Sequence, residues 1–277
     1  MNDYLIAILL GVVEGLTEFL PVSSTAHLRF AQEFLRVDLS SAYWKMFAIV
    51  IQLGAILSVV VYFWKRLVGF VRTFPATGNG RPWWRHPVAL VAISFLVTAG
   101  PCYVIDDKIG ENLESLLIMA WALIVGGVAM WAIDAACRRP RTHAVEHMTL
   151  VQAVVIGAAQ ILAAAFPGTS RSMATIGAGQ LMGLSRPAAL EFSFFLSIPV
   201  MFAATGFKLV QFIAREPATM TAHQWGVLAV GFVMSFAVAL GVVHWFMGWV
   251  KKRGFTPFAI YRLVAGGAIL AYLAWRG

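Results

Sequence analysis

The chain has 277 residues, of which 60% are hydrophobic and only 12% are charged. This composition excludes a water-soluble globular protein and indicates a polytopic helical membrane protein. The formal net charge of +8 comes from Lys and Arg residues clustered in short segments between apolar runs. That distribution follows the positive-inside pattern of membrane proteins, so we expect the charge to report topology, and we expect no nucleic-acid partner.

Six apolar runs are long enough to cross a bilayer as helices, which requires roughly 20 residues each. They cover residues 44–64, 87–105, 116–136, 190–213, 225–250 and 257–275. Two shorter runs, 5–20 and 149–166, each stop at a Pro, and each is followed by a polar loop and another short apolar piece. These pieces are residues 27–35 and 173–184. Broken helices of this kind are tolerated at membrane depth only where protein or a water-filled cavity covers the backbone.

Charged residues between the runs predict the orientation of the chain. The basic segments 65–85, 138–141 and 251–253 are expected in the cytoplasm. An acidic loop is expected outside, and it contains Asp106, Asp107, Glu111 and Glu114. Counting crossings between these points predicts that residues 149–186 enter and leave from the cytoplasmic side as a re-entrant hairpin. The similarity between the two broken segments then predicts a second re-entrant hairpin at residues 5–40, entering from outside.

The two broken segments resemble each other, which indicates an internal duplication. Aligning Pro21 with Pro167 also pairs Glu14 with Gln160, and it sets one polar loop at the same place in each half. The chain is therefore interpreted as two diverged halves.

These patterns predict an all-α polytopic membrane protein with six transmembrane helices plus two re-entrant helical hairpins arranged as an inverted-topology repeat. Residues 1–277 form a single integral membrane domain, with one repeat at about 1–140 and the other at about 147–277. Each repeat holds three spans, so the halves have opposite orientations and their polar loops meet near the midplane.

Glu14 and Glu18 form an acidic pair near the end of the first broken segment. A spacing of four residues puts both on one helical face, with Cβ atoms roughly 5–6 Å apart. Carboxylates this close repel unless one is protonated or a cation lies between them. No Cys or His cluster accompanies them, so we expect Glu14 and Glu18 to bind a hard divalent cation, Mg²⁺ or Ca²⁺. The alternative is that this helical face turns to water at the membrane edge.

Ser23, Ser24 and Thr25 follow the first of these prolines, and His27 follows them. A Ser close to a His is the arrangement of a nucleophile and its base, so Ser24 and His27 are candidate catalytic residues. Ser and Thr after a Pro also cap helices, and both roles can hold at once. For His27, the role of a general acid or base is favoured over that of a packed histidine.

Arg171 lies in the second polar loop, after a Pro-Gly turn and at the start of a predicted helix. A guanidinium together with hydroxyls and the free amides of a helix N-terminus is the arrangement that binds phosphate. The candidate phosphate-binding residues are Thr169, Ser170, Arg171 and Ser172, with Ser23 and Thr25 from the first loop. The alternative is that Arg171 only neutralises Glu14 or Glu18.

Other polar residues within the apolar runs carry weaker predictions. Gln52, Gln160 and Gln180 are secondary polar candidates. Arg262 and Lys208 lie near the ends of predicted spans, where long side chains extend their charged ends to the membrane interface, so we expect them to do the same.

The string EGLTEFLPVSSTAHL, residues 14–28, together with PGTSRS, VIQLGAIL and PFAIYR, resembles the bacitracin-resistance type of undecaprenyl-pyrophosphate phosphatase. The similarity extends over nearly the whole chain. The resemblance implies that the acidic motif of the family falls on Glu14 and Glu18, and that its serine and histidine fall on Ser24 and His27. It implies that the phosphate-binding motif falls on Ser170, Arg171 and Ser172. This chain has Ala26 and Met173 where the family usually has glycine. Ala26 is a small change, whereas Met173 adds bulk beside Arg171, where the resemblance implies a close approach of the backbone to phosphate.

The reaction that the resemblance implies removes the terminal phosphate of undecaprenyl pyrophosphate and returns the monophosphate carrier to cell-wall synthesis. Such an acid anhydride hydrolase belongs in the bacterial inner membrane with its site open to the exterior. Its expected partners are a polyprenyl pyrophosphate lipid and the bilayer, and a homodimer is compatible with the sequence. The alternative is a transporter or flippase of polyprenyl phosphates, which the inverted repeats and broken helices suggest. Paired carboxylates with Ser and His favour hydrolysis, because a carrier needs anion ligands but no nucleophile.

Overall fold

The computed structural model describes residues 2–38, 41–77, 80–104, 115–215 and 220–276. Within these ranges the chain is helical, with no strand beyond a single isolated bridge between Thr142 and Leu184. Six helices are long and apolar enough to cross a membrane. They are α3 (Ala42–Tyr62), α5 (Pro87–Val104), α7 (Leu116–Ala136), α10 (Arg186–Arg215), α11 (Ala222–Arg253) and α12 (Thr256–Arg276). The six predicted spans are thus confirmed, and the chain is a multi-pass helical membrane protein.

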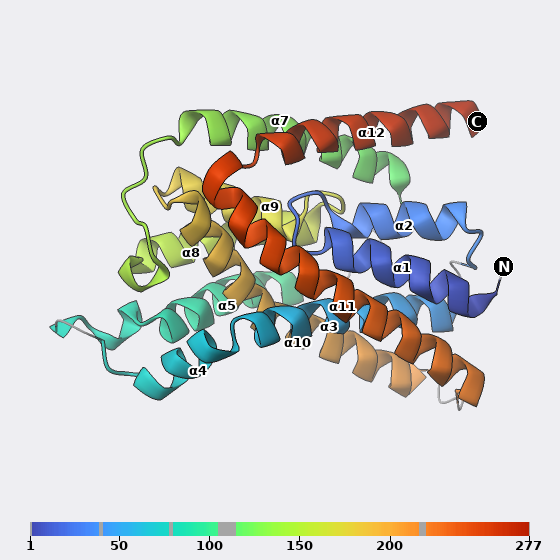
Figure 1. Cartoon of the computed structure of the whole chain (residues 1–277), viewed down its shortest axis with the longest axis horizontal. Helices are drawn as coiled ribbons and strands as arrows, with labels where there is room; N and C mark the ends of the chain where they lie inside the picture. The colour runs from blue at the N-terminus through green and yellow to red at the C-terminus, as the bar shows by residue number, and fades with distance from the viewer. Residues whose placement is uncertain (1, 39–40, 78–79, 105–114, 216–219, 277) are drawn as a thin grey trace.

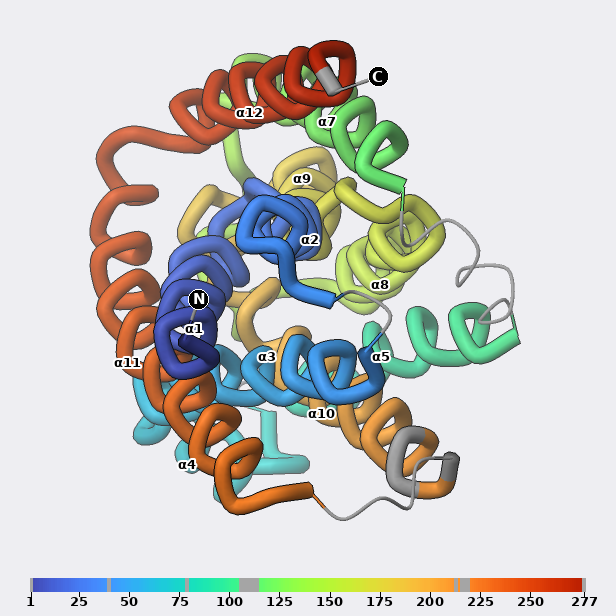
Figure 2. The backbone as a smooth tube through the Cα atoms, turned by 90° about the vertical axis from the view of Figure 1, so that its right-hand side faces the viewer, coloured from blue at the N-terminus to red at the C-terminus, as the bar shows by residue number. Residues whose placement is uncertain are grey.

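Shorter helices form two hairpins in the middle of the molecule. The first hairpin consists of α1 (Asp3–Thr17) and α2 (Ser24–Phe34), and the second of α8 (Leu150–Ala165) and α9 (Arg171–Leu181). Helix α1 starts at the end of the molecule that carries both termini, and α2 runs back toward it, whereas α8 and α9 do the same from the opposite end (Figure 1). In the perpendicular view the hairpins lie between α11 on one side, the α7–α12 pair on another, and α3, α5 and α10 on a third (Figure 2).

Contacts at the open end of each hairpin bring its first and last residues together. The carbonyl oxygen of Gly183, after α9, accepts hydrogen bonds from the backbone N–H groups of Arg141 at 2.7 Å and Thr142 at 3.0 Å, ahead of α8. In the first hairpin, Asp3 of α1 and Val37 beyond α2 line one cavity. Each hairpin therefore begins and ends at the same place, and its loop lies inside the molecule.

Glycines bring both hairpins into backbone contact with long helices. A Cβ added to Gly11 of α1 would lie 2.6 Å from the carbonyl oxygen of Gly231 on α11. A Cβ added to Gly157 of α8 would lie 2.5 Å from the carbonyl oxygen of Ser94 on α5. The Thr98 hydroxyl of α5 also donates to the Gly157 carbonyl oxygen at 2.8 Å. Small residues and short hydroxyl side chains are the usual means of close helix packing in membranes.

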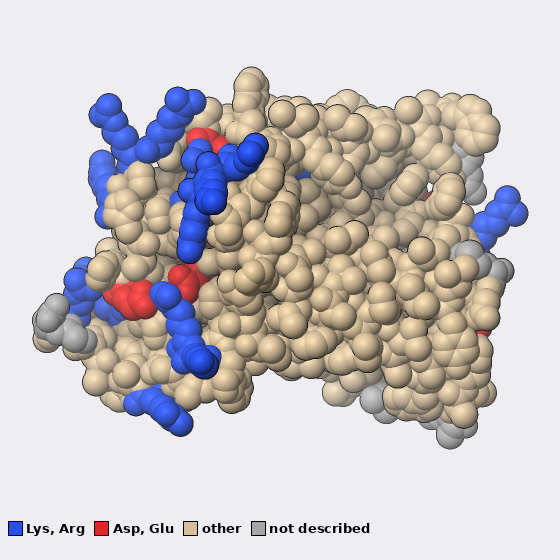
Figure 3. Space-filling model, viewed as in Figure 1, with Lys and Arg blue, Asp and Glu red and all other residues tan. Residues whose placement is uncertain are grey.

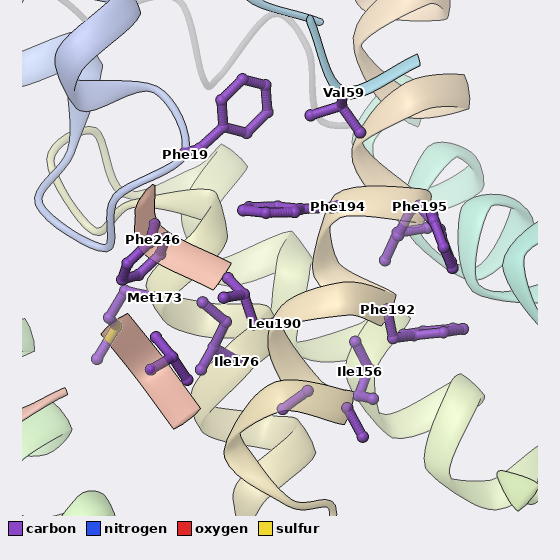
Figure 4. Close-up of a cluster of buried hydrophobic side chains, with 14 of the residues drawn as sticks. Phe19, Val59, Ile156, Met173, Ile176, Leu190, Phe192, Phe194, Phe195 and Phe246 are labelled. Atoms are coloured by element: carbon purple, nitrogen blue, oxygen red, sulfur yellow. The ribbon is translucent and has the colours of Figure 1, made fainter. Parts of the chain in front are cut away.

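A buried apolar cluster joins both hairpins to α3, α10 and α11 (Figure 4). Phe19, which directly follows Glu18, packs edge-on against Phe194 with ring centroids 5.2 Å apart. Met173 and Ile176 of α9 belong to the same cluster. Because interiors of this kind are close-packed, residues beside both polar loops are held in place.

The segment between α3 and α5 differs from the prediction, because it contains another helix, α4 (Trp64–Thr73). Leu67 and Phe70 of α4 pack against the apolar cluster, while Lys65 and Arg66 are exposed. Lys and Arg side chains gather at this end of the molecule (Figure 3). Single-turn 3₁₀ helices η2 (Trp83–Arg85) and η3 (Val145–His147) complete the described elements. The predicted acidic loop, 106–114, lies outside the described residues.

Candidate functional site

The loops of the two hairpins meet inside the molecule and touch directly. Arg171 of the second hairpin donates through Nη2 to Oε1 of Glu18 in the first, at 3.0 Å. The Ser172 hydroxyl donates to the carbonyl oxygen of Leu20 at 2.9 Å. The structure therefore brings together the two polar segments that the sequence indicates as candidates.

Glu18 lies at the centre of this contact and binds groups from both loops. Helix α1 ends at Thr17, well before Pro21, and Glu18 is its C-cap. While Oε1 of Glu18 accepts from Arg171, Oε2 accepts from the Ser24 hydroxyl at 2.5 Å. Glu18 and Ser24 are both buried. Because a short hydrogen bond to a carboxylate is strong, Glu18 is well placed to take the Ser24 proton.

Glu14, one helical turn before Glu18, is completely buried, with an exposed fraction of 0%. This burial excludes the alternative in which the helical face turns to water. Neither carboxylate oxygen of Glu14 has a hydrogen-bond partner among the described residues. An unpaired buried carboxylate is costly, so it needs either a proton or a neighbouring cation.

The donor set at Glu14 and Glu18 fits a hard divalent cation only in part. Across the described residues, no cluster of three or more His, Cys, Asp and Glu side chains is placed to hold a metal. A cation bound to this pair would therefore take further oxygen ligands from water or phosphate, as Mg²⁺ commonly does. The unpaired oxygens of Glu14 are compatible with that role.

A cavity of about 530 Å³ opens beside Arg171, between α5, α8 and α10. Gln160 lines it and is 2% exposed, yet neither polar atom of its amide has a partner among the described residues. Nη1 of Arg171 is also without a partner there. The other walls are mainly apolar and include Phe95 and Phe207. The cavity thus has unpaired polar groups at its inner end and apolar walls, as ligand-binding pockets commonly do.

In each hairpin, the second helix is capped by a serine whose backbone has a positive φ angle. Ser23, the N-cap of α2, has φ 70°, and Ser170, the N-cap of α9, has φ 74°. The two capping serines are not equivalent when the loops are aligned on their prolines, because Ser170 then pairs with Ser24. The second loop therefore has one more residue between its proline and its capping serine than the first. Non-glycine residues with this backbone are strained and often occur at functional sites. The Ser170 hydroxyl lies 3.0 Å from that of Ser172, so two hydroxyls converge beside Arg171.

Several predicted residues lie apart from this group. Thr25 is exposed on α2, and Thr169 lines a separate apolar cavity between α7, α8 and α9. Gln180 lines another cavity, near the loop after α7. Met173 lines the cavity of Thr169 and packs in the apolar cluster. Its side chain therefore packs among apolar residues on the side of α9 that faces that cavity.

His27 is bonded to neighbours other than Ser24. Its Nδ1 donates to the Ser23 carbonyl oxygen at 2.7 Å, and its Nε2 accepts from the Tyr261 hydroxyl at 2.8 Å. The rings of His27 and Tyr261 also stack, with centroids 5.5 Å apart. The structure therefore places Glu18, and not His27, against the Ser24 hydroxyl. Tyr261 was not a sequence candidate, although it lies in the string PFAIYR.

Arg262 contradicts the prediction that it extends to the membrane interface. It is completely buried, with Nη1 donating to the Pro21 carbonyl oxygen at 3.1 Å and Nη2 to that of Gly168 at 3.2 Å. Gly126 of α7 leaves room for it, because an added Cβ there would collide with the guanidinium. A position near the end of a span does not reveal which helical face is covered. Lys208, in contrast, is exposed.

Comparison with known proteins places all of these residues within one family. The family described as Bacitracin resistance protein BacA matches residues 7–268. An undecaprenyl-diphosphatase of Koribacter versatilis is 52% identical, with 100% of both chains covered. An undecaprenyl-diphosphatase of Novosphingobium aromaticivorans is 42% identical, with 100% of both chains covered. One of Deinococcus radiodurans is 37% identical, with 98% of this chain and 96% of the relative covered. This chain therefore belongs to the BacA family of bacitracin resistance proteins.

Proposed function

We propose that this protein is a phosphatase of the bacterial plasma membrane that converts undecaprenyl pyrophosphate into undecaprenyl phosphate and inorganic phosphate. The observation that carries the proposal is Glu18, whose carboxylate holds the Ser24 hydroxyl on one oxygen and the Arg171 guanidinium on the other. A nucleophile, a base and a phosphate-binding group thus lie in one hydrogen-bonded set. The relatives named undecaprenyl-diphosphatase support the substrate, and the reaction recycles the lipid carrier of cell-wall synthesis.

Ser24 is the attacking group in this proposal. Its Oγ bonds to the terminal phosphorus while its proton passes to Glu18, and the bond to the bridging oxygen breaks so that undecaprenyl phosphate leaves. Water then attacks the phosphorus of the phosphoserine. The bond between phosphorus and Ser24 Oγ breaks, inorganic phosphate leaves, and Glu18 returns the proton to Ser24 Oγ. The proton of the attacking water leaves through His27 and Tyr261, whose hydrogen bond lies at the exposed edge of the site.

Arg171 binds the pyrophosphate in this proposal through Nη1, which has no partner among the described residues. The hydroxyls of Ser170 and Ser172 and the N-terminal amides of α9 surround the same region, with Ser23 on the opposite loop. Donors placed in advance stabilise the charge that develops on the transferred phosphoryl group. The ion pair with Glu18 is compatible with this role, because it occupies only Nη2.

A divalent cation, Mg²⁺ or Ca²⁺, would be held by Glu14 and Glu18. Such an ion supplies charge neutralisation and Lewis-acid polarisation of phosphate oxygens. Two buried, unpaired oxygens on Glu14 support this assignment.

The apolar cavity beside Arg171 would hold the first isoprene units of the substrate. Its walls, which include Phe95, Val200 and Phe207, suit a hydrocarbon chain, and the unpaired groups of Arg171 and Gln160 lie at the polar end. A lipid pyrophosphate needs both kinds of surface in one site.

We further propose that both hairpins are re-entrant, that the halves form an inverted repeat within one domain, and that the loops meet near the bilayer midplane. The return of each hairpin to its own starting end supports this topology. The basic end would be cytoplasmic, with the termini and the mouth of the site outside. Single cysteines in a Cys-free background test the orientation. An impermeant thiol reagent added to intact cells should label Asn2→Cys but not Arg139→Cys, and the reverse pattern would contradict it.

Phosphate release by the purified protein from undecaprenyl pyrophosphate, with and without EDTA, tests the function. Rapid-quench trapping with substrate labelled in its terminal phosphate then tests Ser24. Protein-bound label that disappears in Ser24→Ala supports a phosphoserine, whereas no bound label and a variant that still turns over would make water the attacking group. Movement of labelled polyprenyl phosphate across proteoliposomes without phosphate release would favour the transporter alternative.

A further inference from the structure

Arg262 is a buried cation whose partners are all backbone carbonyl groups. Besides Pro21 and Gly168, it donates through Nη2 to Ala122 at 2.9 Å and through Nε to Leu123 at 3.2 Å. No ion pair involves it in the described part of the chain. Burying a charge without a carboxylate partner is costly, so the carbonyl groups must satisfy it together.

These carbonyls come from three segments that must be held in register. Pro21 lies in the loop between Glu18 and Ser24, and Gly168 lies in the loop just before Arg171. The other two carbonyls belong to α7, while Arg262 itself is on α12. One side chain therefore ties both loops to the same pair of long helices.

We infer that Arg262 is a positioning residue, which fixes the distance between the Glu18–Ser24 pair and Arg171 by binding the carbonyl groups of both loops. A guanidinium suits this task because its five N–H donors point in fixed directions, whereas an ammonium has three donors on one atom. Misplacement of reacting groups by about 1 Å can lower a rate by about 100-fold. The inference rests on the proposed phosphatase function for its effect on turnover, but not for its effect on the loops.

Three variants separate this role from general stability. Arg262→Met removes every donor, Arg262→Lys keeps the charge, and Gly126→Ala crowds the guanidinium from α7. The matched control for the arginine is Arg186→Met, because Arg186 is bonded to Asp134 instead of the loops. The control for the glycine is Gly267→Ala on α12, where an added Cβ would have no neighbour within 4 Å.

Hydrogen–deuterium exchange in detergent or nanodiscs gives a readout that does not depend on catalysis. Arg262→Met should raise exchange in residues 18–24 and 166–172 together, whereas Arg186→Met should leave both segments as in the wild type. In phosphate-release assays corrected for the folded fraction, kcat should fall about 100-fold for Arg262→Met and about tenfold for Arg262→Lys and Gly126→Ala, while KM changes less than kcat.

The inference would be overturned if Arg262→Met left exchange in both loops unchanged. It would also be overturned if exchange in the loops rose while kcat stayed at the wild-type value. So would a loss of activity that only follows the folded fraction, as expected for Arg186→Met. If Arg262→Met does not fold, Arg262→Lys and Gly126→Ala decide by the same criteria. A wild-type protein that releases no phosphate would refute the proposed function, while the exchange comparison would still test the link between the loops.

Discussion

The α1–α2 and α8–α9 hairpins share a backbone plan but present different chemical groups. Each begins its second helix after a serine of positive φ, and the first residue of that helix is Ser24 in one and Arg171 in the other. The first helices, α1 and α8, carry Glu14 and Gln160. Both residues are buried, and their polar side-chain atoms have no hydrogen-bond partner among the described residues. The first hairpin thus offers two carboxylates and the Ser24 hydroxyl, and the second offers the hydrogen-bond donors of Arg171 and Gln160.

This division has a simple electrostatic basis. A second carboxylate pair would repel pyrophosphate, and a second arginine in place of Ser24 would remove the hydroxyl that Glu18 holds. Opposite charges on the two loops instead form the Glu18–Arg171 contact. The two hairpins therefore differ in the charge that they present at the site, and substitutions that reduce this difference test its importance.

The largest effect is expected from Glu18→Gln, with Glu14→Gln next, because each replaces a carboxylate of the first hairpin by a neutral amide. Metal-stimulated phosphate release should fall by about 1,000-fold or more, since Glu18 is proposed to act both as a base and as a cation ligand. Glu146→Gln, which changes a carboxylate paired with Arg66 on the basic end, is the matched control and should stay near wild type. Full turnover in either site variant, or in EDTA, would remove the cation from the mechanism.

Arg171→Lys tests whether the second hairpin supplies only charge. We expect it to fail nearly as badly as Arg171→Ala, with a loss of about 3 kcal/mol in transition-state stabilisation, because an ammonium cannot bind Glu18 and phosphate as a planar fork does. Steady-state kinetics on folded protein measures the loss. Recovery of most of the activity by lysine would reduce Arg171 to a counter-charge.

Gln160→Glu gives the second hairpin the acidic residue of the first. A carboxylate in the cavity beside Arg171 should compete with phosphate for the guanidinium, so we expect KM to rise about tenfold while the fold is kept. Gln160→Met, similar in size but without charge, is the control and should change KM less. If the two variants match, Gln160 only fills space.

The smallest effect is expected from Tyr261→Phe, which removes the hydroxyl bonded to His27 and keeps the stacked ring. Loss of one hydrogen bond costs about 1 kcal/mol, or about fivefold in rate. Tyr272→Phe on the same helix, whose ring packs on Phe30, is the control. Equal rates for both variants would remove Tyr261 from proton transfer.

Much of the site was predictable because its residues stand out against apolar surroundings. The contact of Arg171 with Glu18 was foreseen as one of two readings, and the burial of Glu14 follows from its flanking residues. The partner of the Ser24 hydroxyl was not foreseen, because Glu18 reaches it only after α1 ends and the chain turns. Helix α4 was missed because its basic residues masked a short apolar face.

The sequence by itself determined which segments leave water, since the free energy of placing a helix in lipid depends on the summed hydropathy of local residues. It also located the two polar loops, because irregular polar backbone at membrane depth must be covered by protein or water and cannot face lipid. Only the tertiary structure decided which way individual side chains point. Arg262 and Lys208 look alike near the ends of their spans, yet α7 and the loops cover one while the other stays exposed. The direction of a side chain on a helix is set by the neighbours that pack against that face, and those neighbours come from distant parts of the chain.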